Sequence, residues 1–386
     1  MPTAPDAPRQ PRRLLARDEV GTARRAVVKI GSSSLTDGSG RLDPDAVAAV
    51  ADETARLVAR GCEVVLVSSG AIAASLGPLG LHERPADVAA QQAAAAVGQT
   101  LLASAWKAAF SGHDLITGQV LLTEADVIRS ETYRNVRTAL EALLAMGAVP
   151  VVNENDTTAT SEIRFGDNDR LAALVAQLIG ADLLVLLTDV DALYTAPPSE
   201  PGSRRIDVVP DASALEGVSV GSVGSSIGTG GMVTKLAAAQ HAASTGTATI
   251  LTAAERFGAA VAGEDVGTFF PGHRGRRRSR LVWLRFATRG AGSLHVDAGA
   301  AAALTARRRS LLPVGVVSVD GAFPAGVPVD VRGPDGRVLA RGLAAFGSEE
   351  MRRMAGRGTA ELRRELGEGY GRPLIHRDEM VLLPAD

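Results

Sequence analysis

Two lysines stand beside glycine-rich segments that are far apart in the sequence. Lys29 lies near the end of the apolar run Ala26–Ile30, which a glycine and three serines follow. Lys235 closes the segment Gly228–Lys235, in which three glycines precede a predicted helix. Glycines let backbone N–H groups approach phosphate oxygens, and the N–H groups at a helix N-terminus attract anions. The two lysines are therefore candidates to flank a phosphoryl group, although neither segment has the spacing of a P-loop.

A third segment concentrates carboxylates and carboxamides in one predicted loop. It runs from Asn153–Asp156 through Ser161–Phe165 to Gly166–Asp169. Carboxylates suit an ammonium group, whereas amides and backbone N–H groups suit a carboxylate. The loop thus favours a zwitterionic amino acid as ligand. A solvated acidic loop is the alternative, and capping of the next helix is a competing role for Asp169.

The elements that must position these residues alternate between strands and helices. Asp43 is a predicted N-cap with Pro44 at the first helical position. The alternation predicts the α/β class, with βαβ units and a largely parallel sheet. The expected strands cover residues 26–30, 63–67, 115–122, 148–152, 182–187, 247–251 and 266–269, and the expected helices cover 87–110, 132–146, 169–178 and 232–244 besides the one at Asp43.

Polar clusters fall at the predicted C-terminal ends of the strands. Ligands of parallel sheets bind beyond those ends. We therefore expect one composite active site there, built from Gly31–Ser34, Ser68–Gly70, Asn153–Asp156 and Thr188–Asp189.

The character of the sequence changes after Phe270. A basic run, His273–Arg280, is followed by short strand patterns, and the turn Asp335–Gly336 between two of them predicts a β-hairpin over 327–343. We divide the chain into a disordered extension over 1–24, rich in proline and arginine, an α/β domain over 25–272, a basic linker over 273–290 and a small β-rich domain over 291–386.

Composition excludes several classes of protein. The net charge of −2 gives no bulk attraction to nucleic acid or to an anionic membrane. The single cysteine, Cys62, allows no disulfide within the chain and is expected to be a small buried residue. The first residues lack the apolar core of a secretory signal, and no apolar run is long enough for a membrane span. These features predict a cytoplasmic protein.

In combination, the motifs resemble the amino acid kinase superfamily, and more narrowly the glutamate 5-kinase family. The resemblance is carried by the Lys29 strand, Ser68–Ala73, the loop from Asn153 to Asp169, Thr188–Asp189 and Gly228–Lys235, and it extends over residues 25–386. The C-terminal part resembles a PUA domain. The resemblance implies an amino acid kinase fold, an αβα sandwich around a largely parallel sheet, followed by a β-rich PUA-like domain.

The resemblance also implies an activity and the residues that perform it. The γ-phosphoryl group of ATP would pass to the side-chain carboxylate of L-glutamate, which gives L-glutamyl 5-phosphate, the first intermediate of proline biosynthesis. Lys29 and Lys235 would flank the phosphoryl group, and Asp169 would hold both lysines. Ser69, Asp156 and Asn168 would bind glutamate. The implied ATP-binding residues are Lys29, Thr188, Asp189, Thr229, Gly230, Gly231, Met232, Val233, Thr234 and Lys235.

Further expectations concern ligands and partners. Mg²⁺ would accompany ATP, and we expect no structural metal because no His/Cys cluster or EF-hand spacing is present. A glutamate side chain is already ionised at neutral pH, so the reaction needs no general base. Feedback inhibition by proline and assembly into a homo-oligomer follow from the resemblance alone.

Two alternatives stay open at the level of sequence. A related kinase, such as an N-acetylglutamate kinase or an aspartokinase, would keep the fold and change the acceptor. The C-terminal domain could also bind RNA through Arg274–Arg280 and Arg307–Arg309. A solvated charge cluster is the simpler interpretation of these arginines.

Overall fold

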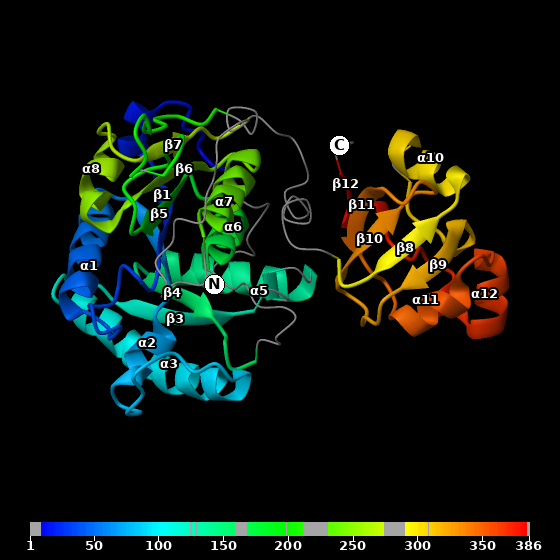
Figure 1. Ribbon diagram of the computed structural model, residues 1–386, viewed down its shortest axis with the longest axis horizontal. Coiled ribbons are helices and arrows are strands. Elements are labelled where there is room, and N and C mark those ends of the chain that lie inside the picture. The colour runs from blue at the N-terminus through cyan, green and yellow to red at the C-terminus, as the bar shows by residue number, and fades with distance from the viewer. Residues whose placement is uncertain are drawn as a thin grey trace. The chain divides into compact units, whose positions relative to one another are not determined.

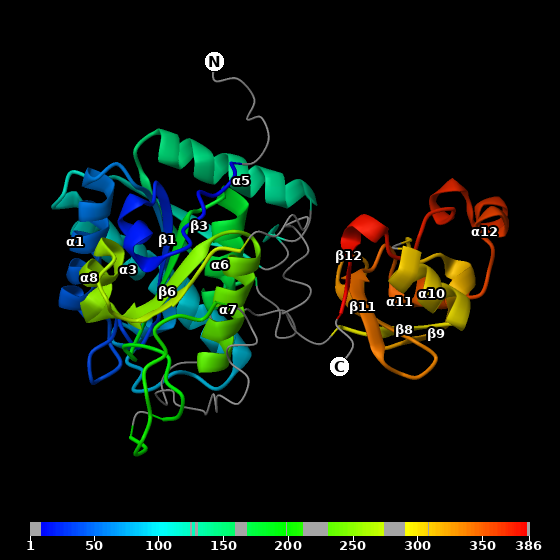
Figure 2. The same cartoon turned by 90° about the horizontal axis from the view of Figure 1, so that it is seen from above.

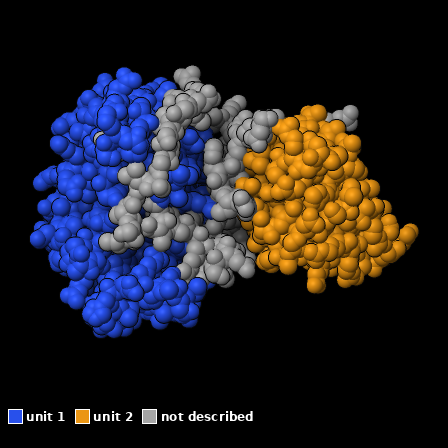
Figure 3. Space-filling view, viewed as in Figure 1, with its two compact units in different colours: residues 1–276 blue, residues 277–386 orange. Residues whose placement is uncertain are grey.

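The chain divides into two compact units, residues 1–276 and 277–386, which are coloured separately in Figure 3. Each unit has its own hydrophobic core. The computed structural model describes residues 9–123, 126–127, 130–158, 168–197, 199–210, 231–273, 290–307 and 309–383.

The first unit is built on a seven-stranded sheet (Figure 1). The strand order is β3-β4-β2-β1-β5-β6-β7, and all neighbours pair in parallel except β7, which is antiparallel to β6. This confirms the predicted largely parallel sheet. The strands are β1 (Arg25–Ile30), β2 (Glu63–Ser68), β3 (Thr117–Leu122), β4 (Val149–Glu154), β5 (Leu183–Thr188), β6 (Ala248–Ala253) and β7 (Thr268–Phe270).

Helices cover both faces of this sheet. Figure 2 shows α1 and α8 on one side and α6 and α7 on the other. The Asp43 carboxylate caps α1 as predicted, because it accepts from the Asp45 N–H at 2.9 Å. The helices are α1 (Pro44–Ala59), α2 (Ala71–Leu76), α3 (Val88–Ser111), α5 (Ser130–Ala145), α6 (Asn168–Ile179), α7 (Met232–Ser244) and α8 (Phe257–Ala262), with a short 3-10 helix at Ala254–Arg256.

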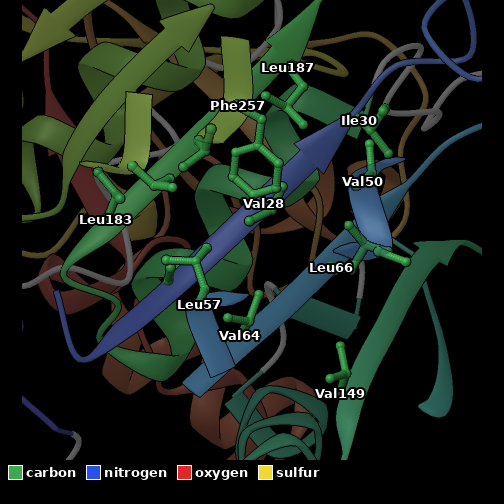
Figure 4. Close-up of a cluster of buried hydrophobic side chains, with 14 of the residues drawn as sticks. Val28, Ile30, Val50, Leu57, Val64, Leu66, Val149, Leu183, Leu187 and Phe257 are labelled. Atoms are coloured by element: carbon green, nitrogen blue, oxygen red, sulfur yellow. The ribbon is translucent and has the colours of Figure 1, made fainter. Parts of the chain in front are cut away.

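The side chains of the central strand β1 point alternately to the two faces of the sheet. Val28 and Ile30 pack with Val50 of α1 and Phe257 of α8 in the core that Figure 4 draws. Because side chains on a strand alternate between faces, Lys29 lies on the opposite face, toward α6 and α7. Its side chain is only 1% exposed. A buried lysine needs an anionic partner from that face.

The N-terminal segment from Arg9 onward packs against the first unit. Leu14 and Val20 are fully buried, and Arg17–Thr22 forms a 3-10 helix. The Arg9 guanidinium donates to both carboxylate oxygens of the buried Asp182, at 3.0 and 3.1 Å. The expected disorder of residues 1–24 is therefore wrong for residues 9–24, and residues 1–8 lie outside the described part. Proline and arginine content indicates disorder only when no folded partner is available, and here Asp182 supplies one.

The second unit contains a five-stranded sheet in the order β12-β11-β10-β8-β9. The predicted hairpin is confirmed: β10 (Pro328–Arg332) and β11 (Val338–Leu343) pair antiparallel. Gly336 has a φ of +79°, which suits the Asp-Gly turn. The other strands are β8 (Ser293–Val296), β9 (Val316–Asp320) and β12 (Met380–Leu382).

Helices that the sequence analysis did not anticipate complete this unit. They are α10 (Ala298–Arg307), α11 (Ser348–Met354) and α12 (Thr359–Leu366), with 3-10 turns at Pro313–Gly315, Glu368–Tyr370 and Arg377–Glu379. Most of the basic linker, residues 274–289, lies outside the described residues.

Cys62 is buried, and this burial raises the pKa of its thiol to about 12, so it behaves as the small buried residue that was predicted. Among the described residues, none of the helices combines the length and apolar character that crossing a membrane requires.

Candidate active site

The C-terminal ends of four parallel strands bring the predicted polar residues to one edge of the sheet. In the ladder, Lys29 of β1 stands beside Val67 of β2 and Leu186 of β5. Consequently Ser68 and Thr188, the last residues of those strands, lie at the same edge. Glu154 ends β4, the neighbour of β2 on its other side. The expected composite site is thus assembled from segments more than a hundred residues apart.

The carboxylate of Asp169 joins the two lysines. Lys29 Nζ lies 2.6 Å from Asp169 Oδ1, and Lys235 Nζ lies 3.3 Å from Asp169 Oδ2. Asp169 is fully buried at the start of α6, and Lys235 is 8% exposed on the first turn of α7. The structure therefore brings together the three residues that were predicted to be catalytic. The roles assigned to them remain predictions at this point.

Two ammonium groups gather at the Asp169 carboxylate in a largely buried site. Ammonium groups donate charge-assisted hydrogen bonds to phosphate oxygens, so a phosphoryl group is a suitable ligand for this cluster. The backbone of Gly31 is close to it, since a Cβ built there would lie 3.6 Å from Lys29 Nζ.

The first turn of α7 contributes to the same cluster. Gly231 is its N-cap, and Thr234 Oγ1 lies 3.2 Å from Asp169 Oδ2 and 2.7 Å from the Gly231 carbonyl oxygen. Met232 and Val233 occupy the first two helical positions. The N-terminus of α7 is thus next to the lysine pair, where its N–H groups add to the attraction for an anion. The predicted Thr229 and Gly230 lie outside the described residues.

A second cluster gathers amide and hydroxyl groups beside the lysines. Asn168 precedes Asp169 on α6, and its Nδ2 donates to Asn153 Oδ1 at 2.7 Å. The same nitrogen lies 2.8 Å from the Ser68 carbonyl oxygen and 3.1 Å from Ser69 Oγ. Two of the three predicted glutamate-binding residues, Ser69 and Asn168, are therefore in contact. Asp156 lies in the turn after β4 and is half-buried.

The remaining predicted nucleotide-binding pair stands at the end of β5. Thr188 Oγ1 donates to Asp189 Oδ1 at 2.9 Å. Because β5 neighbours β1, the pair lies at the same edge of the sheet as Lys29. No hydrogen bond within the described part of the chain connects this pair to the lysine cluster.

Supporting residues on α3 were missed by the sequence analysis. Gln99 Nε2 donates to the Glu154 carbonyl oxygen at 3.2 Å, and Trp106 Nε1 donates to Ser68 Oγ at 3.0 Å. Gly98 packs so closely on α2 that a Cβ would lie 1.6 Å from the Ala71 carbonyl oxygen. The only signal in the sequence was Gly98 itself, an isolated glycine in an alanine-rich helix.

The described residues contain no group of three or more His, Cys, Asp or Glu side chains that could hold a metal ion.

The sequence profile of the amino acid kinase family matches residues 24–252, and that of the PUA domain matches residues 292–366. The first match covers the whole lysine–carboxylate–lysine cluster and the large sheet from β1 to Thr252 of β6. Carbamate kinase from Giardia lamblia bound to AMP-PNP has a similar structure, with a TM-score of 0.50 at 17% identity over 66% of this chain and 100% of that one. The chain belongs to the amino acid kinase family, a class of phosphotransferases, and carries a PUA domain.

Relatives that match nearly the full length of the chain indicate which family of amino acid kinases it belongs to. Glutamate 5-kinase of Bifidobacterium longum subsp. infantis is 54% identical over 97% of this chain and 99% of its own length. The glutamate 5-kinase of Streptomyces coelicolor is 54% identical over 95% and 99%, and that of Thermobifida fusca is 52% identical over 95% of both chains. Within the amino acid kinases, the chain is a member of the glutamate 5-kinase family.

Proposed function

We propose that this chain transfers the γ-phosphoryl group of ATP to the side-chain carboxylate of L-glutamate, which yields L-glutamyl 5-phosphate and ADP. The observation that carries the proposal is the buried cluster in which Asp169 holds Lys29 and Lys235 at 2.6 and 3.3 Å. The amide and hydroxyl groups of Asn168 and Ser69 beside it support an amino-acid acceptor.

In this reaction an oxygen of the glutamate side chain attacks the γ-phosphorus. The bond from that phosphorus to the β–γ bridging oxygen breaks, and its electron pair leaves with ADP. The attacking carboxylate is already ionised at neutral pH, so no side chain has to remove a proton. The barrier comes from bringing two anions together and from charge that spreads over the equatorial oxygens.

The lysine cluster supplies the stabilisation that this step needs. The two ammonium groups provide donors to the transferring phosphoryl group, and Asp169 fixes their positions before the substrates arrive. Thr188, Asp189, the first turn of α7 and Thr229–Gly230 would hold ATP. Mg²⁺ would enter with the nucleotide, coordinated mainly by phosphate oxygens and water. Ser69, Asp156 and Asn168 would bind glutamate.

The proposal also includes inhibition by proline and assembly into a homo-oligomer. Proline carries an α-carboxylate, as glutamate does, and a positively charged secondary ammonium group in its ring. Binding at the glutamate-binding residues would therefore make it a competitive inhibitor. The proposed homo-oligomer follows from the family. A titration of proline at several glutamate concentrations measures the first feature, and light scattering measures the second.

A coupled test identifies both the reaction type and the acceptor. The purified protein is incubated with ATP and Mg²⁺ and with glutamate, N-acetylglutamate or aspartate in parallel, and hydroxylamine traps any acyl phosphate. We expect hydroxamate with glutamate alone. Hydroxamate with N-acetylglutamate or aspartate instead would retain the kinase and refute the assigned acceptor. Absence of turnover with all three in folded protein would refute the proposed function.

A further inference from the structure

The amides of Asn153 and Asn168 form a hydrogen-bonded pair whose direction the backbone determines. The Glu154 N–H donates to Asn153 Oδ1 at 2.9 Å. A backbone N–H can only donate, so it must face the carbonyl oxygen of the Asn153 side chain rather than its nitrogen. That oxygen also accepts from Asn168 Nδ2 at 2.7 Å, which fixes the orientation of the second amide as well.

The amide nitrogen of Asn168 has no hydrogen left for a ligand. It carries two hydrogens and already faces three protein acceptors, Asn153 Oδ1, the Ser68 carbonyl oxygen and Ser69 Oγ. Asn168 can therefore present only its carbonyl oxygen to a ligand. A carbonyl oxygen accepts from an ammonium group and repels a carboxylate.

The amide nitrogen of Asn153 is in the opposite situation. The side chain is 4% exposed, and Nδ2 has no hydrogen-bond partner although it is buried. A buried donor without a partner is unfavourable, and native proteins rarely keep one without a functional reason. The Ser69 hydroxyl accepts from Asn168 and so retains its own hydrogen to donate. Asn153 Nδ2 and the Ser69 hydroxyl are thus two donors in one hydrogen-bonded cluster. The Asn168 carbonyl oxygen beside them is an acceptor.

We infer that Asn153 is a further substrate-binding residue, which donates from Nδ2 to a carboxylate of the amino-acid substrate, while Asn168 accepts from the substrate's ammonium group. This inference rests on the proposed function and deepens it, since it assigns opposite ends of a zwitterion to two neighbouring asparagines. Ser69 donates to the carboxylate together with Asn153. The Glu154 N–H, at the end of β4, determines the polarity of the whole arrangement.

The test exchanges the donor of Asn153 and leaves its acceptor in place. In Asn153→Asp one oxygen still accepts from Glu154 and Asn168, while the other replaces the donor with a negatively charged acceptor. We expect the KM for glutamate to rise by about 10-fold or more, and the KM for ATP to stay within about two-fold of the wild-type value. Asn135→Asp, the same chemical change at an exposed position on α5, is the control and should alter neither KM.

Thermal melting with each substrate separates binding from folding. A ligand that binds the folded state raises Tm. In Asn153→Asp we expect the Tm increase by ATP to persist and that by glutamate to diminish. A glutamate KM within two-fold of wild type would overturn the inference, and so would loss of both Tm increases, because Asn153 would then be structural. These results leave the proposed function intact, whereas a wild-type protein that does not phosphorylate glutamate refutes the proposed function itself.

Discussion

At the scale of single residues, the chain uses lysine almost nowhere except in its site. It contains three lysines, Lys29, Lys107 and Lys235, and its other basic side chains, apart from six histidines, are arginines. Two of the three share the Asp169 carboxylate. A compact ammonium group fits the buried space beside Asp169, whereas a guanidinium is larger, planar and presents its donors in a fixed fork.

Replacement of either site lysine should slow phosphoryl transfer. We expect Lys29→Ala and Lys235→Ala to lower kcat by ~10²–10³-fold, the usual cost of removing one donor to a charge that develops in the transition state. Lys29→Arg should also be impaired, for the geometric reason given above. Lys107→Ala, at an exposed position on α3, is the matched control. A kcat unchanged in Lys29→Ala or Lys235→Ala would remove that lysine from the mechanism.

His241 gives a prediction about pH. It lies on the buried face of α7, where it forms a 2.7 Å hydrogen bond with Gln177 Oε1. Burial, and to a lesser degree repulsion by Arg170, lowers the pKa of His241 to about 3. Between that value and 6.5 the unfolded chain binds a proton that the folded chain does not, so stability falls as pH decreases through this window.

The contribution of His241 to the pH dependence of stability can be measured by comparing the wild type with a variant that lacks the histidine. Each pH unit below 6.5 should cost about 1.4 kcal/mol from this residue. In His241→Gln this contribution disappears, so the stability difference between variant and wild type should change steadily in favour of the variant from pH 6.5 to pH 4.5. Urea unfolding at several pH values measures it. A constant difference across this range would mean that His241 is not buried as a neutral group.

At the scale of elements, α3 is the support of the substrate-binding half of the site. Its Gln99 holds the end of β4 and its Trp106 holds the end of β2. Its Gly98 lies against the Ala71 carbonyl oxygen at the start of α2, directly after Ser69 and Gly70. Displacement of α3 would therefore move the glutamate-binding residues before it affects the lysines.

A methyl group at Gly98 should produce that displacement. Gly98→Ala places a Cβ 1.6 Å from a backbone oxygen, so the helices must separate. We expect a loss of ~1–3 kcal/mol of unfolding free energy, and an increase in the KM for glutamate larger than that for ATP. Gly112→Ala, at the end of the same helix, is the control because its Cβ would meet only an ordinary contact at 3.5 Å. Equal stability of the two variants would contradict the close packing.

At the scale of the whole molecule, the chain combines two units with separate cores. Every described residue of the lysine and amide clusters belongs to residues 1–276. Among the described residues, the core of the second unit is formed by residues from Leu294 onward. The second unit therefore provides no described part of the proposed reaction. The arginines at 274–280, for which RNA binding was left open as an alternative, lie outside the described residues.

Removal of the second unit should leave the chemistry in place. We expect a chain of residues 1–276 to fold and to form glutamyl hydroxamate with a kcat within about five-fold of the full chain, because the first unit retains its core and its complete site. Calorimetry of the full chain should resolve two transitions, of which one persists in the shortened chain. Loss of all activity in a folded shortened chain would show that the PUA unit takes part in catalysis.

Hydrophobic periodicity and local sequence signals were sufficient to predict most helices and strands of the first unit. The strand that carries Lys29, the cap at Asp43 and the helix Met232–Ser244 were predicted within two residues, because each depends on neighbours in the sequence. The helix α2 was missed because six residues give too little periodic pattern to recognise. The ordered segment from Arg9 was missed because its partner, Asp182, is 173 positions away.

The sequence by itself determined which residue types could handle a phosphoryl group and an amino acid, and that parallel strands would gather them at one edge. Only the tertiary structure decided that Asp169 pairs with both lysines and does more than cap a helix, because the pairing requires α6, α7 and β1 to meet. The tertiary structure also decided that Asn153 has its amide nitrogen available to donate to a ligand, while Asn168 has its carbonyl oxygen available to accept. That polarity comes from one backbone N–H at the end of β4, and its direction exists only once the strand is part of the sheet.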